Sequence, residues 1–230
     1  MDVIQAIKER KSIRAFRPDP VPQDLLRKIL EQAQRAPSWA NTQPWEFAVV
    51  TGEKLKAIQD AFVKRGAAAM QNYQSDVARP PDFPEPFISR IKKMQVKENR
   101  GRTTQATPAE MEARMNTNFR HYGATTCIYI IVARNFVYQE KGNNMWALFD
   151  CGAVEQTIML LATNYGLGTI AQAMAVVYPD IIHKELGIPD DKLIALGIAI
   201  GYPDWSNQVN EDFRDREPLD EICKFYGFEK

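Results

Sequence analysis

Residues 126–133 read Thr-Cys-Ile-Tyr-Ile-Ile-Val-Ala, a continuous apolar run that is rich in β-branched residues. Such a run predicts a strand that is buried on both faces. The apolar run from Leu193 to Gly201 predicts a second buried strand, and Trp45 to Val50 predicts a third. The sequence therefore predicts a central sheet that other elements must cover.

Helical patterns flank these strands. Asp2 can cap a short N-terminal helix. A second helix begins near Pro22 and carries an apolar stripe with a period of 3.6, made of Leu25, Leu26, Ile29, Leu30 and Ala33. Met145 to Tyr165 is apolar nearly all round and predicts a central helix, whereas Thr169 to Val177 is expected to be extended. Interleaved helices and strands, with more helix than strand, indicate an α/β or α+β sandwich.

Residues 66–115 differ from the rest of the chain. Residues 66–73 are expected to be helical, but Pro80, Pro81, Pro84 and Pro86 then disfavour regular structure. Two charged helical patches come next, over residues 87–98 and 108–120. Because this part has no dense apolar core of its own, we interpret it as an excursion, such as a lid. The whole chain, residues 1–230, is then a single domain.

The composition limits the classes of partner. The chain has 29 basic and 29 acidic residues and a formal net charge of zero, which argues against a nucleic-acid or membrane-surface protein. Its longest apolar runs are far shorter than the ~20 residues that a membrane helix needs. The charged N-terminal stretch does not resemble a secretion signal, so we expect a cytoplasmic protein.

Cysteine and histidine offer little chemistry. The three cysteines, Cys127, Cys151 and Cys223, have spacings that fit no metal or redox motif, so buried free thiols are expected. His121 and His183 are far apart in the sequence, with no cysteine or carboxylate cluster beside them. A zinc site and a Ser-His-Asp triad are therefore poorly supported, and no metal is expected.

Two basic clusters could bind a phosphate group. In an extended chain Arg10, Ser12 and Arg14 lie on one face, and two guanidinium groups with a hydroxyl suit a phosphate monoester. Arg214 and Arg216 could complete the same site. The alternatives are a solvated charge cluster at a helix end and a mixed-charge surface tail.

The loop Ala36-Pro-Ser-Trp-Ala-Asn-Thr-Gln-Pro-Trp45 combines a hydroxyl, two amides and two tryptophans between prolines. Amides can pair with the edge of a flat heterocycle, and a tryptophan can cover its face. The alternative is a capped turn whose tryptophans belong to the core.

The segment Gly166-Leu-Gly-Thr-Ile-Ala171 matches the loose dinucleotide pattern G-x-G-x-x-A, but the context excludes that interpretation. The pattern requires a strand before the glycines and a helix after them, and the reverse order is expected here. These glycines are better explained as a helix end where the backbone can approach a ligand.

Taken in series, these segments resemble the nitroreductase family of FMN enzymes. The resemblance runs from Ile7 to Leu219. Its motifs are Arg10-Lys-Ser-Ile-Arg-Ala-Phe16, Ala36-Pro-Ser-x-x-Asn-x-Gln-Pro-Trp45-x-Phe47, Asp150-x-Gly152-x-x-x-Gln156 with Gly166-Leu-Gly-Thr169, and Ile200-Gly-Tyr-Pro203 with Arg216-Glu-Pro-Leu219.

The resemblance implies an α+β fold, with a central mixed or antiparallel sheet surrounded by helices, in an interleaved homodimer with FMN at the interface. It implies that the FMN phosphate is held by Arg10, Ser12 and Arg14 with Arg214 or Arg216, and that Lys11 shares this role. The resemblance further implies that Asn118 lies near the pyrimidine edge of the flavin and that the backbone N–H groups around Gln172 and Ala173 face flavin N5. The loop residues that reach the flavin of the other subunit are Pro37, Ser38 and Asn41, with Trp39 and Gln43 beside them.

The resemblance also implies the activity. An NAD(P)H-dependent oxidoreductase would pass hydride through the flavin to a small flat electrophile such as a nitroaromatic or a quinone, with no catalytic nucleophile from the protein. Trp39, Tyr138, Phe83 and Phe87 are candidate pocket walls, whereas core packing is favoured for Trp146. The alternatives are a specialised member (a reductive dehalogenase, an enone reductase or a flavin-consuming enzyme), a non-catalytic flavin-binding protein, and a non-flavin protein that binds a phosphate ligand.

Overall fold

The computed structural model describes residues 1–66, 75–78, 80, 82–98, 106–211 and 214–228. The contacts within the chain divide it into two compact units. The first unit consists of residues 1–79 and 106–210, and the second consists of residues 80–105 and 211–230.

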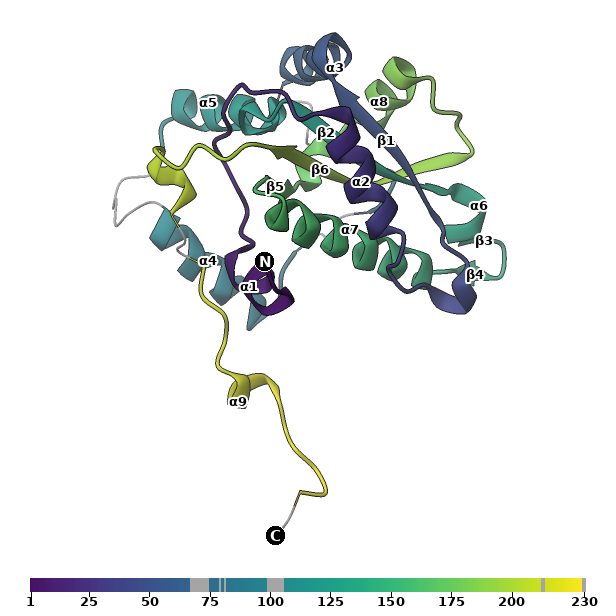
Figure 1. Ribbon diagram of the computed structural model, residues 1–230, viewed down its shortest axis with the longest axis vertical. Coiled ribbons are helices and arrows are strands. Elements are labelled where there is room, and N and C mark those ends of the chain that lie inside the picture. Colours follow the sequence, from purple (N-terminus) through teal and green to yellow (C-terminus); the bar gives the residue numbers. More distant parts are fainter. Residues whose placement is uncertain (67–74, 79, 81, 99–105, 212–213, 229–230) are drawn as a thin grey trace. The chain divides into compact units, whose positions relative to one another are not determined.

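The first unit is built on a four-stranded antiparallel sheet (Figure 1). Its strand order is β1 (Trp45–Thr51), β2 (Thr126–Ala133), β6 (Lys192–Gly201) and β5 (Gly168–Ala171). Phe47 pairs with Ile130, and Thr169 pairs with Ile200. A small hairpin, β3 (Tyr138–Gln139) with β4 (Gly142–Asn143), stands apart from this sheet.

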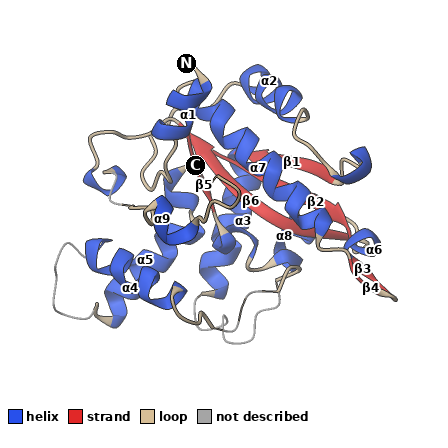
Figure 2. Cartoon of the chain, turned by 90° about the horizontal axis from the view of Figure 1, so that it is seen from below, coloured by secondary structure: helices blue, strands red, loops and turns tan. Residues whose placement is uncertain are grey.

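Strand β2 is buried on both faces, as its sequence predicts. Alternate residues enter two separate cores, because successive side chains of a strand point to opposite faces. Ile128, Ile130 and Val132 pack with α2 (Gln23–Ala33) and α7 (Trp146–Asn164). Cys127, Tyr129 and Ile131 pack with α3 (Gly52–Arg65) and α8 (Pro179–Leu186). Helices thus cover both faces of the sheet (Figure 2), and the predicted α+β architecture is confirmed.

The predicted helices are present. Asp2 caps α1 (Val3–Glu9), with its Oδ1 accepting from Gln5 N at 2.8 Å. The two helices expected in the excursion are α4 (Phe87–Glu98) and α5 (Pro108–Phe119), and α5 belongs to the first unit. The helix predicted over residues 66–73 lies, beyond Gly66, outside the described residues. The short elements are α6 (Arg134–Val137), α9 (Leu219–Ile222) and the 3-10 turns η1 (Trp39–Asn41), η3 (His121–Gly123), η4 (Ala173–Val176) and η5 (Gln208–Asn210).

The prediction that residues 169–177 are extended is wrong in its second half. Strand β5 ends at Ala171, and η4 comes next as a 3-10 turn. Ala175 and Val176 are buried in this turn and pack with the core residues of α3 and α8. Tertiary packing therefore overrides the local pattern, which reads equally well as a strand.

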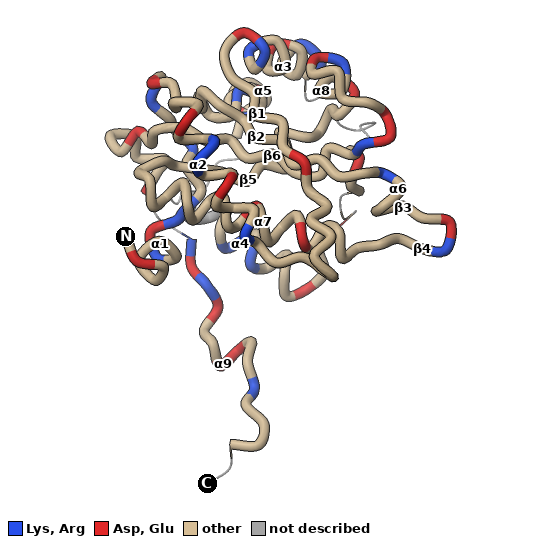
Figure 3. Tube along the Cα trace, turned by 45° about the vertical axis from the view of Figure 1, so that its right-hand side comes forward, with Lys and Arg blue, Asp and Glu red and all other residues tan. Residues whose placement is uncertain are grey.

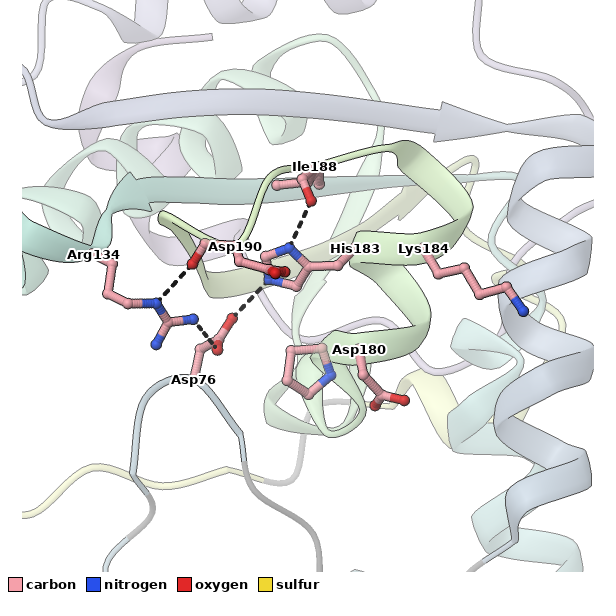
Figure 4. Close-up of a pocket in the computed structure, with 8 residues that line it drawn as sticks. Asp76, Arg134, Asp180, His183, Lys184, Ile188 and Asp190 are labelled. Atoms are coloured by element: carbon pink, nitrogen blue, oxygen red, sulfur yellow. Dashed lines mark hydrogen bonds and ion pairs between the residues drawn. The ribbon is translucent and has the colours of Figure 1, made fainter.

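Asp76 fastens residues 75–78 to the sheet where β5 no longer covers β6. Its carboxylate is 10% exposed and accepts hydrogen bonds from Ile194 N at 2.9 Å and Arg134 Nη2 at 3.0 Å. His183 Nε2 lies 3.3 Å from Oδ2, the same carboxylate oxygen that accepts from Ile194 N. Figure 4 shows Asp76 lying between Arg134 and His183. The carboxylate thus supplies an acceptor that a neighbouring strand would otherwise provide.

Charged residues of both signs alternate along the chain, for example at the tip of the β3–β4 hairpin (Figure 3). This pattern agrees with a net charge of zero. Within the described ranges, every helix is too short or too polar to cross a membrane.

Candidate active site

The segment after α1 runs along the sheet like an additional strand. Ser12 forms a parallel bridge with Thr169 of β5, and Ile13 N donates to Thr169 O at 3.0 Å. Phe16 forms an antiparallel bridge with Pro203, just beyond β6. Asn210 secures the same segment, because its Oδ1 accepts from Arg14 N at 2.7 Å and its Nδ2 donates to Ala15 O at 2.8 Å. The first basic cluster is therefore held on a rigid support.

Ile13 and Gly168 explain why this support is so close to β5. A Cβ atom on Gly168 would lie 2.6 Å from Ile13 Cγ1 and 2.8 Å from Pro203 Cγ. Real Cβ atoms do not approach other atoms so closely, so only glycine allows this contact. Gly166, at a φ of 77°, follows the end of α7 as predicted, whereas the close approach at Gly168 is made by Ile13, and an approach to a ligand stays a prediction.

Side chains alternate between two faces of this extended segment, so its cations lie on different faces. Ile13 is 2% exposed and points to the protein interior, so Arg10, Ser12 and Arg14 share the opposite face. These three residues are half-buried, and Arg14 Nη1 donates to Ser12 O at 3.4 Å. Lys11 instead lines a cavity of about 520 Å³ with Ile13, and its Nζ lies 5.3 Å from the centre of the Trp205 ring. The structure therefore does not bring Lys11 to the face of the two arginines.

The turn after β5 joins three elements. Gln172 is 6% exposed, and its Nε2 donates to Asn118 Oδ1 at 2.8 Å and to Asn118 O at 3.2 Å. The predicted pair of Asn118 and Gln172 is thus brought together. The backbone N–H of Gln172, however, donates to Gly197 O at 2.8 Å, so it is not available to a ligand as expected from the sequence. Ala173 is exposed and begins the 3-10 turn, where its own N–H has no acceptor within the helix.

Two polar atoms at β5 and its turn lack partners. Thr169 Oγ1 and Gln172 Oε1 are buried, and neither has a hydrogen-bond partner among the described residues. A buried polar atom without a partner costs about 1–3 kcal/mol, so a structure rarely keeps one without a reason. Thr169 is the residue of β5 that pairs with Ser12, and Gln172 follows in the turn after the strand.

The loop over residues 36–45 is a compact, strained turn. Ser38 Oγ accepts from Gln43 N at 3.0 Å, and Gln43 Nε2 donates to Asn41 O at 3.1 Å. Ala40, Asn41 and Gln43 have φ angles of 50°, 57° and 45°. Such positive values cost energy for residues other than glycine and cluster at functional sites.

The two tryptophans of this loop have different environments. Trp45 is 7% exposed and belongs to the core, as the alternative interpretation predicts. Trp39 is 60% exposed, and its backbone N–H donates to Asp150 Oδ2 at 3.2 Å. Its ring stacks edge-on against Trp146 with 5.5 Å between the ring centres. Because Trp146 is itself 56% exposed, the favoured prediction that it packs in the core is wrong. The first turn of α7 projects beyond the core.

The sequence profile of the nitroreductase family matches residues 7–202, which contain the segment with Ser12, the loop over residues 36–45 and the turn at Gln172. The chain belongs to the nitroreductase family. Nitroreductase NfnB of Mycolicibacterium smegmatis is 31% identical over 98% of this chain and 94% of its own length. The 4-nitrobenzoate reductase of Nocardioides sp. is 30% identical over 95% of this chain and 87% of its own length.

Solved structures agree with the sequence relatives. The FMN- and NADPH-dependent nitroreductase NfnB from Sphigopyxis sp. strain HMH superimposes with a TM-score of 0.89 at 31% identity, covering 99% of this chain and 100% of that chain. The FMN-dependent NfnB from Mycobacterium smegmatis in complex with NADPH has a TM-score of 0.87 at 28% identity, covering 98% of this chain and 100% of that chain. The nitroreductase fold predicted from the motifs is confirmed.

In this nitroreductase, Arg214 and Arg216 belong to the second unit. Arg216 Nη1 donates to the carbonyl oxygens of Asp215 at 3.0 Å and Arg214 at 3.4 Å. In the same unit, Arg90 Nε lies 3.5 Å from Glu217 Oε1, and these residues line a cavity of about 460 Å³. Arg10 belongs to the first unit, so the contribution of Arg214 or Arg216 to the phosphate site at Arg10 stays a prediction.

Buried titratable residues of this nitroreductase family member have structural roles. His121 comes after α5 at a φ of 53° and is fully buried, which lowers its pKa to about 4. Gln59 Nε2 lies 3.2 Å from its Nδ1. Cys127 and Cys151 are buried free thiols, as predicted, and burial raises the pKa of each to about 12, whereas the prediction is wrong for Cys223, whose free thiol is only half-buried. Neither thiol is therefore an activated nucleophile.

Sequence reasoning missed three residues. Asn210 carried no signal because it is an isolated amide in a polar tail, and Thr169 was read only as part of a glycine motif. Gly197 was hidden inside an apolar strand. All three act through backbone contacts that only the folded chain brings together.

Proposed function

We propose that the protein is an FMN-dependent oxidoreductase that takes hydride from NAD(P)H and delivers it to a small flat electrophile such as a nitroaromatic or a quinone. The observation that carries this proposal is the pair of buried polar atoms without a partner among the described residues, Thr169 Oγ1 of β5, whose residue pairs with Ser12, and Gln172 Oε1 of the turn after it. Membership of the nitroreductase family and similarity to FMN- and NADPH-dependent enzymes support it.

The residues present fit FMN. Its phosphate needs cations and hydrogen-bond donors, which Arg10, Ser12 and Arg14 supply from one face of a fixed segment. Its ring edge carries both donors and acceptors, so it suits the unpartnered Gln172 Oε1 and the N–H of Ala173. Asn118 would lie at the same edge, because Gln172 Nε2 holds its side chain at 2.8 Å.

The protein and the cofactor have separate tasks. Bound FMN supplies the hydride chemistry, and the chain supplies binding, orientation and electrostatics. Donors preorganised near flavin N1, where reduction leaves negative charge, would favour the reduced form, whereas the Ala173 N–H would orient the ring at N5. No protein nucleophile is required.

A homodimer is part of the proposal. An exposed aromatic cluster at the start of α7 is formed by Trp39, Trp146 and Phe149, which are 60%, 56% and 64% exposed. Adjacent rings in this cluster have centres 5.5 and 5.4 Å apart. Contiguous apolar surface of this kind usually marks an interface, and a second copy of the chain is the partner that the family resemblance implies. Pro37, Ser38, Trp39, Asn41 and Gln43 would then reach the partner's flavin.

The remaining expectations complete the proposal. The chain would act as a single flavin-binding domain in the cytoplasm, with residues 66–115 as a lid beside the substrate. Arg214 or Arg216 would add a cation to the phosphate site, and Lys11 would lie at its margin.

The decisive experiment uses the purified protein. We expect a yellow preparation whose released cofactor is FMN, and NADH or NADPH should bleach the bound flavin without oxygen. Nitroaromatic, quinone, enone and halophenol oxidants should then be compared by how fast each restores the yellow colour of the oxidised flavin. A colourless protein that binds no added FMN contradicts the proposal, and a bound flavin that neither NADH nor NADPH reduces indicates a non-catalytic binder.

A further inference from the structure

We infer that Gly197 of β6 is a positioning residue that sets the place of the Gln172–Ala173 turn against the flavin. The inference rests on the proposed function, because it takes this turn as a flavin contact. Gly197 itself is buried within the sheet and acts through the turn.

The first observation is a hydrogen bond beyond the end of a strand. Pairing between β5 and β6 ends at Ala171 and Ile198. The chain then leaves the sheet, but Gln172 N still donates to Gly197 O at 2.8 Å. This bond ties β6 to the first residue of the turn, so Gly197 fixes the point at which the turn begins.

The second observation is the missing side chain. A Cβ atom on Gly197 would lie 2.7 Å from Ala175 Cβ and 3.3 Å from Val176 Cγ1. The nearer neighbour cannot rotate away, because it is a Cβ atom of the turn itself, and Ala175 is only 1% exposed. Any side chain at Gly197 must therefore push η4 away from the sheet.

Backbone conformation does not account for this glycine. Its φ angle lies outside the left-handed region that favours glycine. Glycine in a strand interior also weakens the strand, so its presence there marks a close approach. The close approach at Gly197 is that of η4.

A displacement of η4 would reach the proposed flavin contacts directly. Ala175 N donates to Gln172 O at 3.2 Å, so the residues from Gln172 to Ala175 form one closed turn. Gln172 is tied in addition to Asn118 of α5. Moving Ala175 therefore moves the Ala173 N–H and strains the Gln172 side chain whose Oε1 is buried without a partner.

Four proteins test the inference: wild type, Gly197→Ala, Ala175→Gly and the double variant. FMN dissociation constants are measured by fluorescence quenching on the apoprotein, together with the midpoint potential of the bound flavin and the melting temperature of the apoprotein. Gly197→Ala should weaken FMN binding about tenfold, as expected for the loss of one good hydrogen bond, and shift the midpoint potential away from the wild-type value. Ala175→Gly alone should keep wild-type affinity.

The double variant removes the atom nearest to the new Cβ and should return the affinity to within about threefold of wild type, together with the wild-type potential. The inference is overturned if Gly197→Ala keeps the wild-type affinity for FMN and the wild-type midpoint potential. It is also overturned if the double variant folds but still binds FMN weakly. If Gly197→Ala does not fold, the double variant decides alone, and its own failure to fold also counts against the inference. Wild-type protein that binds no FMN contradicts the proposed function instead.

Discussion

Ile13 fills the space in which any residue other than glycine at position 168 would carry its Cβ, with only 2.6 Å between that position and Ile13 Cγ1. The segment with Arg10, Ser12 and Arg14 can approach β5 only because of this fit. Gly168→Ala should therefore overpack the contact and destabilise the protein by about 1–3 kcal/mol, with weaker FMN binding. Urea denaturation and FMN titration measure the two effects. Ile13→Ala combined with Gly168→Ala should cost less than the sum of the single changes, and strict additivity would contradict direct contact.

Removing both arginines from the first basic cluster tests the phosphate site. Arg10→Ala with Arg14→Ala should leave a folded but colourless protein, because the phosphate loses its charge-assisted hydrogen bonds. Absorbance of the purified protein and circular dichroism check this outcome. Arg27→Ala with Lys56→Ala is a matched control that removes two exposed cations elsewhere in the same unit. Full flavin occupancy in the Arg10 and Arg14 variant would place the phosphate elsewhere.

The aromatic cluster of Trp39, Trp146 and Phe149 predicts how the oligomer responds to a charge. Trp146→Glu should yield monomers, since an unpaired carboxylate cannot be buried at an apolar interface without a large cost. Light scattering after size-exclusion chromatography measures the mass, and FMN content should fall with it. Trp205→Glu changes another exposed tryptophan and should leave the mass unchanged. A dimeric Trp146→Glu protein would exclude this surface as the interface.

His121 predicts a pH dependence of stability. Burial lowers the pKa of His121 from 6.5 to about 4, so the folded protein holds the neutral ring. The stabilisation is complete above the unfolded-state pKa near 6.5 and is lost as the pH falls toward 4, by up to about 3 kcal/mol. His121→Asn tolerates the positive φ of this position and lacks the titrating ring. The difference in unfolding free energy between wild type and variant should therefore shrink from pH 7 to pH 4, and a constant difference would refute the prediction.

Substitution of Asp76 is predicted to lower the stability of the protein rather than its catalytic activity. Asp76→Asn removes the charge that Arg134 and His183 face and weakens its acceptance from Ile194 N, so unfolding should become easier by about 1–3 kcal/mol. Asp180→Asn is the matched control, because the Asp180 side chain is 64% exposed in its ion pair with Arg65 and should contribute less than about 1 kcal/mol. Urea denaturation at fixed protein concentration compares them. Equal effects of the two substitutions would contradict the anchoring role.

Sequence patterns identified the local features. The run of residues 126–133 predicted a strand buried on both faces, and the alternation of Arg10, Ser12 and Arg14 around a buried Ile13 results from extended geometry alone. The motifs also identified the family, because six segments in a fixed order are far more specific than any one of them.

The errors concern distant contacts. Ala173–Val176 was predicted to be extended because its apolar residues fit a strand, but its conformation depends on the missing side chain of Gly197. Trp146 was assigned to the core because its helix is apolar nearly all round, yet the first turn of α7 extends past the sheet. Neither outcome can be read from residues close in sequence.

The anchor at Asp76 has a practical consequence for engineering. Because the Asp76 carboxylate, together with the hydrogen bond from Tyr138 Oη to Asp76 O at 2.8 Å, secures the chain to the first unit shortly before residue 80, we expect the sheet to tolerate changes in residues 80–105. Loop libraries grafted between residues 80 and 105, with Asp76, Arg134 and His183 left intact, would diversify that segment while the scaffold of the catalyst stays constant.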